Sequence, residues 1–255
     1  MKVAKLRENR KMGKLSFYNS VVDFTHIYIK FDKRAKPKFL FTLIADKIKK
    51  LLKGKLQTKK LLDVGGGRGV FAYYIKQCFP KMECTCIDID KELIKVGRQH
   101  NKECTYILGD ANHMDQLGSH EFDFVTFLGV LSGCDDFKTV FNECFRVCKK
   151  TGVIFIISAF NDYGVDRLVR YRYSHDTGPW KRCYNLFSKQ SISKFLKPHP
   201  LVKKWKFERV FFPFDLPKQK DPIRSWTERD LSGNRIFKNG LGLEYHLDIL
   251  SVFLK

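Results

Sequence analysis

A run of small and apolar residues at positions 61–70 constrains this chain more than any other stretch. It reads Leu-Leu-Asp-Val-Gly-Gly-Gly-Arg-Gly-Val. The apolar residues at its start are typical of a buried parallel strand, and the residues that follow have helical spacing. Glycines bring backbone close to a ligand, because they lack a Cβ and adopt positive φ at little cost. The pattern predicts a strand, a glycine turn and a helix, either as plain architecture or as a ligand-binding turn.

The spacing of the glycines indicates which ligand the turn suits. Gly65, Gly67 and Gly69 alternate, whereas a dinucleotide-binding turn requires a small residue where Val70 stands. A phosphate-binding P-loop is also excluded, since no Gly-Lys-Ser or Gly-Lys-Thr follows. If the turn binds a ligand, it therefore favours a nucleoside without a pyrophosphate.

Acidic residues end three consecutive predicted strands, and open α/β sheets bind their ligands at such strand ends. Asp63 lies just before the glycine turn. Asp88 follows 19 residues after Gly69, about the distance at which a carboxylate meets the hydroxyls of a ribose. Asp110 can accept from an adenine amino group, and Ala111 beside it leaves room for a flat base. Together the three acids favour a nucleoside site over an ordinary turn.

Strand and helix patterns alternate through the middle of the chain. Predicted helices cover residues 39–52, 70–79, 91–100 and 137–149, and predicted strands cover residues 61–64, 83–88, 105–108, 122–128 and 153–158. Lys149–Gly152 is predicted to be a turn between the last helix and the last strand. The alternation predicts an α/β fold with a doubly wound, mostly parallel sheet.

Charge is unevenly distributed along the chain. Residues 1–60 carry 18 Lys and Arg against 4 Asp and Glu, residues 61–160 carry 11 against 13, and residues 161–255 carry 19 against 10. Basic flanks attract nucleic acid, anionic lipid or an acidic substrate, or they are simply solvated surface.

Other features bear on location and metals. The sequence has no apolar run of eighteen residues and no signal-like start, and its eight cysteines do not have zinc spacing. We therefore expect a reduced, cytoplasmic chain without a transmembrane segment. Asp135 and Asp136 are interpreted as acids at the start of a helix, and no metal is expected.

These motifs resemble those of the class I methyltransferases that use S-adenosylmethionine. Residues 63–69 resemble their first motif, and Leu128–Leu131 resembles the strand end that faces the methyl group. In outline, the chain is also similar to uncharacterised bacterial methyltransferases of the small-molecule type. The resemblance implies that S-adenosylmethionine is the cofactor and that it is bound by Asp63, Gly65, Gly66, Gly67, Asp88, Ile89, Asp110, Ala111 and Leu128.

The resemblance also implies a Rossmann-like sheet of seven strands. The tail would supply two of them, at residues 205–214 and 245–254, with the last one antiparallel. A Ser-Gly pair at 232–233 predicts an added β-hairpin between them. We expect three parts: a basic, aromatic and helical N-terminal extension and lid, a cofactor-binding domain, and an acceptor lid with the hairpin and last strands of the same domain. They cover residues 1–38, 39–160 and 161–255.

The catalytic residues are expected in the segment after the fifth strand. Methyl transfer to a hydroxyl usually needs a base or a metal, whereas transfer to an amine or a carboxylate can proceed without a base. His175, with Tyr173 close by, is the candidate base, and a surface histidine is the alternative. Aromatic residues that either line an acceptor pocket or belong to the core are Phe17, Tyr18, Tyr28, Trp180 and Tyr184.

The expected function is methyl transfer to oxygen or nitrogen of a small-molecule or carbohydrate-like acceptor. Residues 128–132 lack the Asn/Asp-Pro-Pro-aromatic pattern of enzymes that methylate nucleobase nitrogens. Two alternatives stay open. One is an RNA methyltransferase that uses the basic flanks, since Lys-rich segments with aromatics such as 195–207 suit phosphate contact and base stacking. The other is a cofactor-binding protein without turnover. The sequence does not decide the oligomeric state.

Overall fold

The computed structural model of the chain describes residues 36–54 and 58–255. The predicted N-terminal extension and lid, with Phe17, Tyr18 and Tyr28, therefore lie outside the described residues, apart from residues 36–38.

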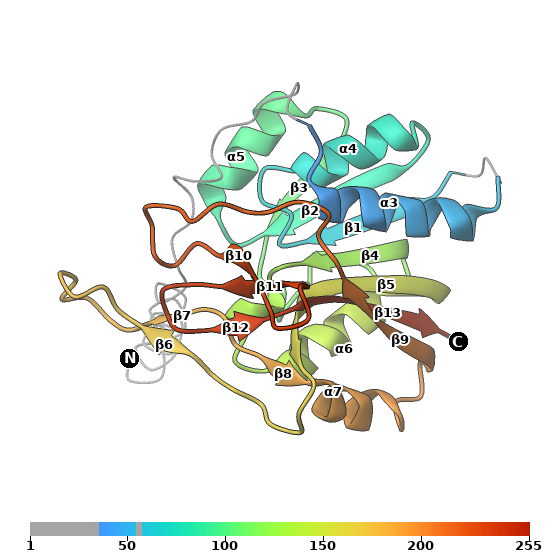
Figure 1. Cartoon of the computed structure of the whole chain (residues 1–255). Coiled ribbons are helices and arrows are strands. Elements are labelled where there is room, and N and C mark those ends of the chain that lie inside the picture. Colours follow the sequence, from blue (N-terminus) through green and yellow to red (C-terminus); the bar gives the residue numbers. More distant parts are fainter. Residues whose placement is uncertain (1–35, 55–57) are drawn as a thin grey trace, which may run out of the picture.

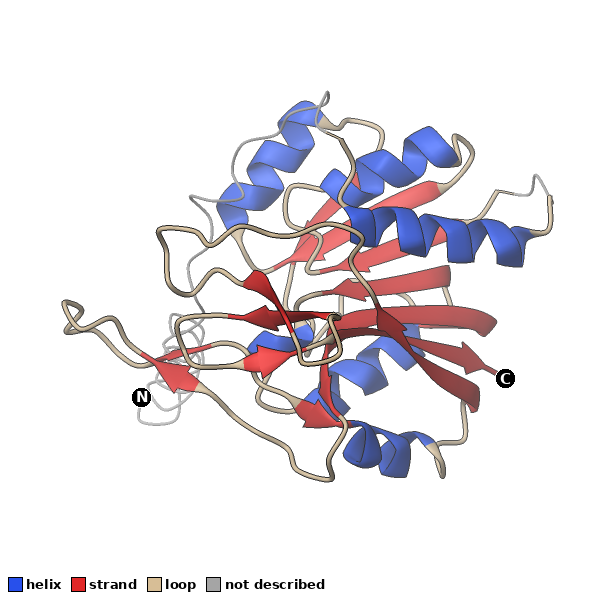
Figure 2. Cartoon of the chain, in the orientation of Figure 1, coloured by secondary structure: helices blue, strands red, loops and turns tan. Residues whose placement is uncertain are grey.

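A central sheet with the strand order β3-β2-β1-β4-β5-β13-β9 forms the body of the molecule (Figures 1 and 2). Its strands are β1 (Lys60–Val64), β2 (Glu83–Asp88), β3 (Thr105–Leu108), β4 (Phe122–Leu128), β5 (Cys148–Asn161), β9 (Val202–Val210) and β13 (Leu247–Leu254). Strands β1 to β5 pair in parallel, and β13 is antiparallel to both of its neighbours. The predicted Rossmann-like, mostly parallel sheet is confirmed. An eighth short strand, β8 (Phe187–Ser188), pairs with the end of β5 and was not predicted.

Helices cover both faces of this sheet because its strands are apolar on both sides. Along β1, Leu61 packs with the residues of one face and Leu62 with those of the other. The first face is covered by α3 (Phe39–Leu52), α4 (Val70–Cys78) and α5 (Lys91–His100). The second is covered by α6 (Phe137–Val147) and α7 (Lys189–Leu196). The sequence predicted all of these helices except α7.

The junction between α6 and β5 differs from its prediction. The helix ends at Val147, not at residue 149, and Lys149–Gly152 is not a turn but belongs to β5. The pairing steps from Phe122 opposite Cys148 to Phe124 opposite Val153, so the first residues of β5 form a bulge. The β pairing of Cys148 overrides the helix and turn signals of the basic residues and glycine after it.

The tail adds smaller sheets at the side of the molecule where the parallel strands end (Figure 1). The predicted hairpin is confirmed: β10 (Trp226–Arg229) and β11 (Arg235–Lys238) pair antiparallel, and β12 (Glu244–Tyr245) adds a third strand. The predicted strand at 205–214 is shifted to β9, and that at 245–254 is divided between β12 and β13. A second pair, β6 (Arg170–Tyr171) and β7 (Lys181–Arg182), belongs to the segment after β5.

Within residues 36–54 and 58–255, no helix has the length and apolar character needed to cross a membrane.

Candidate functional site

The glycine turn joins β1 to α4 and is fixed against the end of β2. The Gly65 amide donates a 2.8 Å hydrogen bond to the carbonyl of Ile87. Gly65 has a φ of 71°, and a Cβ added to it would lie 2.4 Å from Cγ2 of Val130. Only glycine meets both demands, since the left-handed backbone and the close approach each disfavour a side chain. The turn thus packs directly beneath the loop that follows β4.

Asp88 ends β2 with its carboxylate already oriented by backbone groups. Its Oδ2 accepts from the Gly67 amide at 2.7 Å, and its Oδ1 accepts from the Asp90 amide at 2.9 Å. Burial raises the pKa of Asp88, although these two hydrogen bonds oppose the shift. A carboxylate has about four acceptor positions, so each oxygen can take a further hydrogen bond. The arrangement suits a vicinal diol.

The ends of β2 and β3 also present apolar surface. Ile89 is 46% exposed and Leu108 is 45% exposed, so both side chains offer apolar surface at these neighbouring strand ends. Asp110 follows Leu108, and its Oδ1 accepts from the backbone and side-chain amides of Asn112, both at 2.9 Å. Ala111 packs against the core beside it. Apolar faces flanked by a carboxylate are what a flat base with an exocyclic amino group requires.

Asp63 lies beneath the glycine turn and is only 3% exposed. Its Oδ1 accepts a 2.8 Å hydrogen bond from the Thr126 hydroxyl, and a Cβ on Gly66 would meet its Oδ2 at 2.9 Å. Burial raises the pKa of Asp63 to about 7, with a smaller contribution from the charge of Asp88 and an opposing one from Thr126. Asp63 thus contacts both Thr126 and the glycine turn, and its contact with a cofactor stays a prediction.

Two further side chains support the turn from behind, and the sequence analysis missed them. The Tyr106 hydroxyl donates to the carbonyl of Arg68 at 3.3 Å. Asn101, which is buried, has its side-chain amide 3.4 Å from the carbonyl of Gly69. The one available signal was Gly97 in the middle of α5, because an isolated glycine in a helix indicates close packing. A Cβ there would lie 2.3 Å from the Tyr106 ring.

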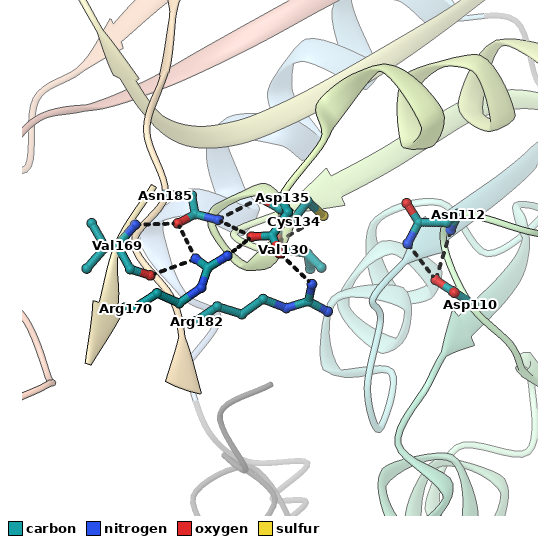
Figure 3. A network of polar contacts seen from close by, with 9 residues as sticks. All are labelled: Asp110, Asn112, Val130, Cys134, Asp135, Val169, Arg170, Arg182 and Asn185. Atoms are coloured by element: carbon teal, nitrogen blue, oxygen red, sulfur yellow. Dashed lines mark hydrogen bonds and ion pairs between the residues drawn. The ribbon is translucent and has the colours of Figure 1, made fainter. Parts of the chain in front are cut away.

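The loop after β4, residues 129–135, is held by polar contacts from the segment after β5 (Figure 3). Leu128 ends β4 beside Ile157 of β5. Asn185 donates from its side chain to the carbonyl of Cys134 at 2.7 Å and to Asp135 at 3.1 Å. We call residues 129–135 the strand-four loop and residues 162–186 the lid.

Asp135 and Asp136 have different roles, and only one matches its interpretation from sequence. Asp136 caps α6, accepting from the amides of Lys138 and Thr139, as predicted. Asp135 does not cap the helix: it pairs with Arg170 at 2.7 Å and Arg182 at 3.0 Å, both from the lid. These partners are distant in sequence, which is why the local pattern missed them.

The two proposed catalytic residues lie together on the lid, in the hairpin loop between β6 and β7. Their rings stack with centroids 5.4 Å apart. Tyr173 donates a 2.9 Å hydrogen bond to Asp221, and burial together with Asp221 raises its pKa to about 12. The hairpin projects away from the central sheet in Figure 1. Tyr173 and His175 thus contact each other, whereas Gly67 and Asp88 contact each other at the end of β2, and within residues 36–54 and 58–255 no hydrogen bond or ring contact joins the two pairs.

Tyr184 connects the lid to the accessory sheet. Its hydroxyl donates to the carbonyl of Ile223 at 2.6 Å and lies 3.2 Å from Oγ of Ser225, which in turn bonds to Tyr245. A carbonyl only accepts, so the single phenolic proton of Tyr184 is committed and Ser225 must donate to it. Burial raises the pKa of Tyr184. Trp180 is exposed, with Arg172 over its ring.

The strand-end residues fit S-adenosylmethionine as a ligand. A diol acceptor at Asp88, apolar surface at Ile89 and Leu108, and three consecutive glycines at 65–67 are the groups such a ligand needs. Over the described ranges, 36–54 and 58–255, no group of three His, Cys, Asp or Glu side chains is placed to hold a metal ion.

A surface hollow of about 590 Å³ lies elsewhere, between α6 and α7. Its lining consists of Phe137, Lys138, Asp166, Ser191, Lys194, Phe195, Pro198, His199 and Pro200. None of these residues belongs to the strand ends that carry Asp88 and Asp110. We therefore place the candidate cofactor site by its chemistry rather than by the size of this hollow.

Comparison with known proteins relates the middle of the chain to methyltransferases. Residues 62–156 match the family model described as a methyltransferase domain. The chain is 27% identical over 103 residues to the demethylmenaquinone methyltransferase of Thermotoga maritima, an alignment that covers 40% of this chain and 44% of that protein. The chain spans about two fifths of the length of the curated relatives it matches.

Solved structures share the fold at low identity. The 1,6-didemethyltoxoflavin-N1-methyltransferase of Burkholderia thailandensis, solved with 1,6-didemethyltoxoflavin and S-adenosylhomocysteine, has a TM-score of 0.54 and 15% identity, over 98% of this chain and 90% of that one. The [4+2]-cyclase SpnF has a TM-score of 0.51 and 17% identity, over 71% of this chain and 65% of that one. Proteins with this fold are therefore named for different reactions, a methyl transfer in one case and a cyclisation in the other. Because the fold does not determine the reaction, the activity has to be argued from the site.

Proposed function

We propose that this chain, whose residues 62–156 form a class I S-adenosylmethionine-dependent methyltransferase domain, transfers the methyl group of that cofactor to a small molecule. One observation carries the proposal: the Asp88 carboxylate is held by the Gly67 and Asp90 amides at the end of β2, with acceptor positions left for a ribose. The finer proposal is a small-molecule or carbohydrate-like acceptor, methylated on oxygen or nitrogen.

The bound cofactor would supply a methyl group on a positively charged sulfur, so the protein itself needs to do little covalent chemistry. Asp88 would accept from the ribose hydroxyls, and Asp110 would accept from the adenine amino group. The glycine turn would face the amino-acid part, because its backbone can come close without a Cβ. Ile89, Ala111 and Leu128 would bound the site with apolar surface.

The lid and the strand-four loop would serve the acceptor. Transfer in line with the departing sulfur requires the acceptor atom to be held in position and water to be excluded. We propose His175 as the group that removes a proton when the acceptor is a hydroxyl, with the lid moving its hairpin toward the strand ends. Tyr173 would orient His175 by stacking, since a pKa near 12 keeps its own hydroxyl protonated at neutral pH.

The names of the matched relatives support a small-molecule acceptor. The curated proteins that the chain matches include methyltransferases named for demethylmenaquinone, malonyl-[acyl-carrier protein] and ubiquinone biosynthesis. Their names differ in the acceptor, so they support the class of acceptor and leave its identity open.

The test begins with calorimetry of S-adenosylmethionine and S-adenosylhomocysteine on the purified protein. Methyl-labelled cofactor is then incubated with the protein and with two separate pools, a low-mass metabolite extract and total RNA. Label in the metabolite fraction supports the proposal. Label in RNA, with binding that weakens steeply with salt, would establish the alternative acceptor. Tight cofactor binding with no transfer to either pool would contradict enzymatic activity.

A further inference from the structure

Asn185 occupies a fully buried position between the lid and the strand-four loop, and its exposed fraction is 0%. Its backbone amide donates to the carbonyl of Ser132 at 2.9 Å. Its side-chain amide donates to the carbonyl of Cys134 at 2.7 Å and to Oδ1 of Asp135 at 3.1 Å. Ser132, Cys134 and Asp135 of the loop are therefore all held by one residue of the lid.

The other end of the same side chain points back into the lid. Oδ1 of Asn185 accepts from the amide of Val169 at 2.7 Å, one residue before β6 (Figure 3). Both donor positions and the acceptor of the amide are thus used, and this fixes its orientation. Removing the side-chain amide would take these partners from the Cys134 carbonyl, the Asp135 carboxylate and the Val169 amide, and leaving such groups unpaired away from water is unfavourable.

A second layer of contacts surrounds this amide. Asp135 lies within ion-pair distance of Arg170 and Arg182, which bracket the lid hairpin at β6 and β7. Figure 3 shows both guanidinium groups reaching from the lid to Asp135. These ion pairs are partly exposed, and they add to the connection that the buried amide of Asn185 makes.

The strand-four loop also meets the glycine turn. The Val130 side chain packs so closely over Gly65 that a Cβ there would be 2.4 Å from it. The Gly129 amide anchors the same loop on the carbonyl of Ile157 at 2.8 Å. A continuous series of contacts thus runs from the glycine turn through Val130 and the strand-four loop to Asn185 and the lid.

We propose that Asn185 is a positioning residue that couples occupation of the cofactor site to the order of the acceptor lid, and this inference rests on the proposed function. A ligand in the glycine turn holds Val130 and the strand-four loop in one position, and Asn185 passes that constraint to the lid. The lid is then ordered before the acceptor binds. Since coupling is reciprocal, an ordered lid also favours cofactor binding.

Hydrogen exchange with S-adenosylhomocysteine as the probe tests the coupling. In the wild-type protein, the probe should slow exchange by about fivefold or more in both the strand-four loop and residues 167–171. In Asn185→Asp, which keeps the acceptor but loses both donors, the loop should still respond and residues 167–171 should not. Asn161→Asp is the matched control. Asn161 bonds Val165 and Tyr163, not the strand-four loop, and this variant should keep the lid response.

Asn185→Ser repeats the test with a smaller, uncharged side chain if the Asp variant does not fold. Calorimetry on each variant measures binding of the probe separately. Binding of the probe with no lid response in the wild type, or a lid response that persists in both Asn185 variants, overturns the coupling alone. Absence of probe binding in the wild type overturns the proposed function, and the coupling with it.

Discussion

The Thr126 hydroxyl donates a 2.8 Å hydrogen bond to Oδ1 of Asp63 beneath the glycine turn, inside the sheet. This pair joins the central strands β1 and β4 at the point where the turn begins. Because Asp63 is buried, its pKa is raised from the ordinary 3.8 to about 7, and the folded protein holds a proton there that the unfolded chain gives up near pH 4.

The contribution of Asp63 to the free energy of unfolding should therefore fall as the pH rises. Between about pH 4 and pH 7 the folded state binds more protons at Asp63 than the unfolded state does, so this residue lowers the free energy of unfolding by up to about 1.4 kcal/mol per pH unit. Asp63→Asn, which imitates the protonated acid, should become more stable relative to the wild type from pH 5 to pH 8. Urea unfolding at the two pH values measures the change.

Asp123→Asn is a control of opposite sign. Burial raises the pKa of Asp123, but hydrogen bonds from Lys149 and Lys59 outweigh it, and the net pKa lies below its ordinary value. The stability that Asp123 contributes is present above about pH 4 and is lost as the pH falls through its lowered pKa. Between pH 5 and pH 8 the stability of Asp123→Asn relative to the wild type should therefore stay constant, and an equal gain in both variants would contradict the assignment for Asp63.

Asp88→Ala should weaken S-adenosylmethionine binding severalfold or more, because it removes the acceptor for two hydroxyls. It also releases the Gly67 amide, which loosens the turn. Asp90→Ala is the control, since it removes the cap of α5, which costs about 1 kcal/mol of stability, while keeping the Asp88 carboxylate. Calorimetry on both variants separates the two roles. Equal affinity of Asp88→Ala and the wild type, with the fold intact, would refute the ribose assignment.

Gly97→Ala should destabilise the protein although alanine is the better helix former by about 1 kcal/mol. The added Cβ would lie 2.3 Å from the Tyr106 ring, and overpacking of this kind costs about 1–3 kcal/mol. The double variant Gly97→Ala with Tyr106→Ala should lose less stability than the two single changes together. Denaturant unfolding of the four proteins provides the cycle, and strictly additive losses would argue against the contact.

Local sequence signals predicted most of the sheet and the strand-end acids. The alternation of strand and helix patterns depends on residues close together in the chain. It predicted β2, β3 and β4 with the bounds that the structure shows. The Ser-Gly pair likewise located the β10–β11 hairpin. Asp88 was recognisable because its distance from the glycine turn is set by one helix and one strand, α4 and β2.

What could not be predicted depends on pairs of residues far apart in the chain. Nothing near Asn185 signals its contact with Cys134, and nothing near Asp135 signals Arg170 or Arg182. Asp63 is predicted to bind the cofactor, and this stays a prediction; its burial beside Thr126 of β4 was not visible in the sequence, because the two residues are far apart in the chain. The β5 bulge arises from pairing with β4, which overrides the turn signal of Lys149–Gly152.

The catalytic proposal for the lid makes the last prediction. His175→Gln should lower the rate of methyl transfer to a hydroxyl acceptor by about 10²–10⁴ and leave S-adenosylmethionine affinity unchanged, because it removes a proton acceptor and no cofactor contact. Tyr173→Phe should have a smaller effect, since it loses only the hydrogen bond to Asp221 and keeps the ring that stacks on His175. Initial rates with the acceptor found in the labelled metabolite fraction provide the measurement. A His175→Gln enzyme as fast as the wild type would show that the acceptor is methylated without this base, as expected of an amine.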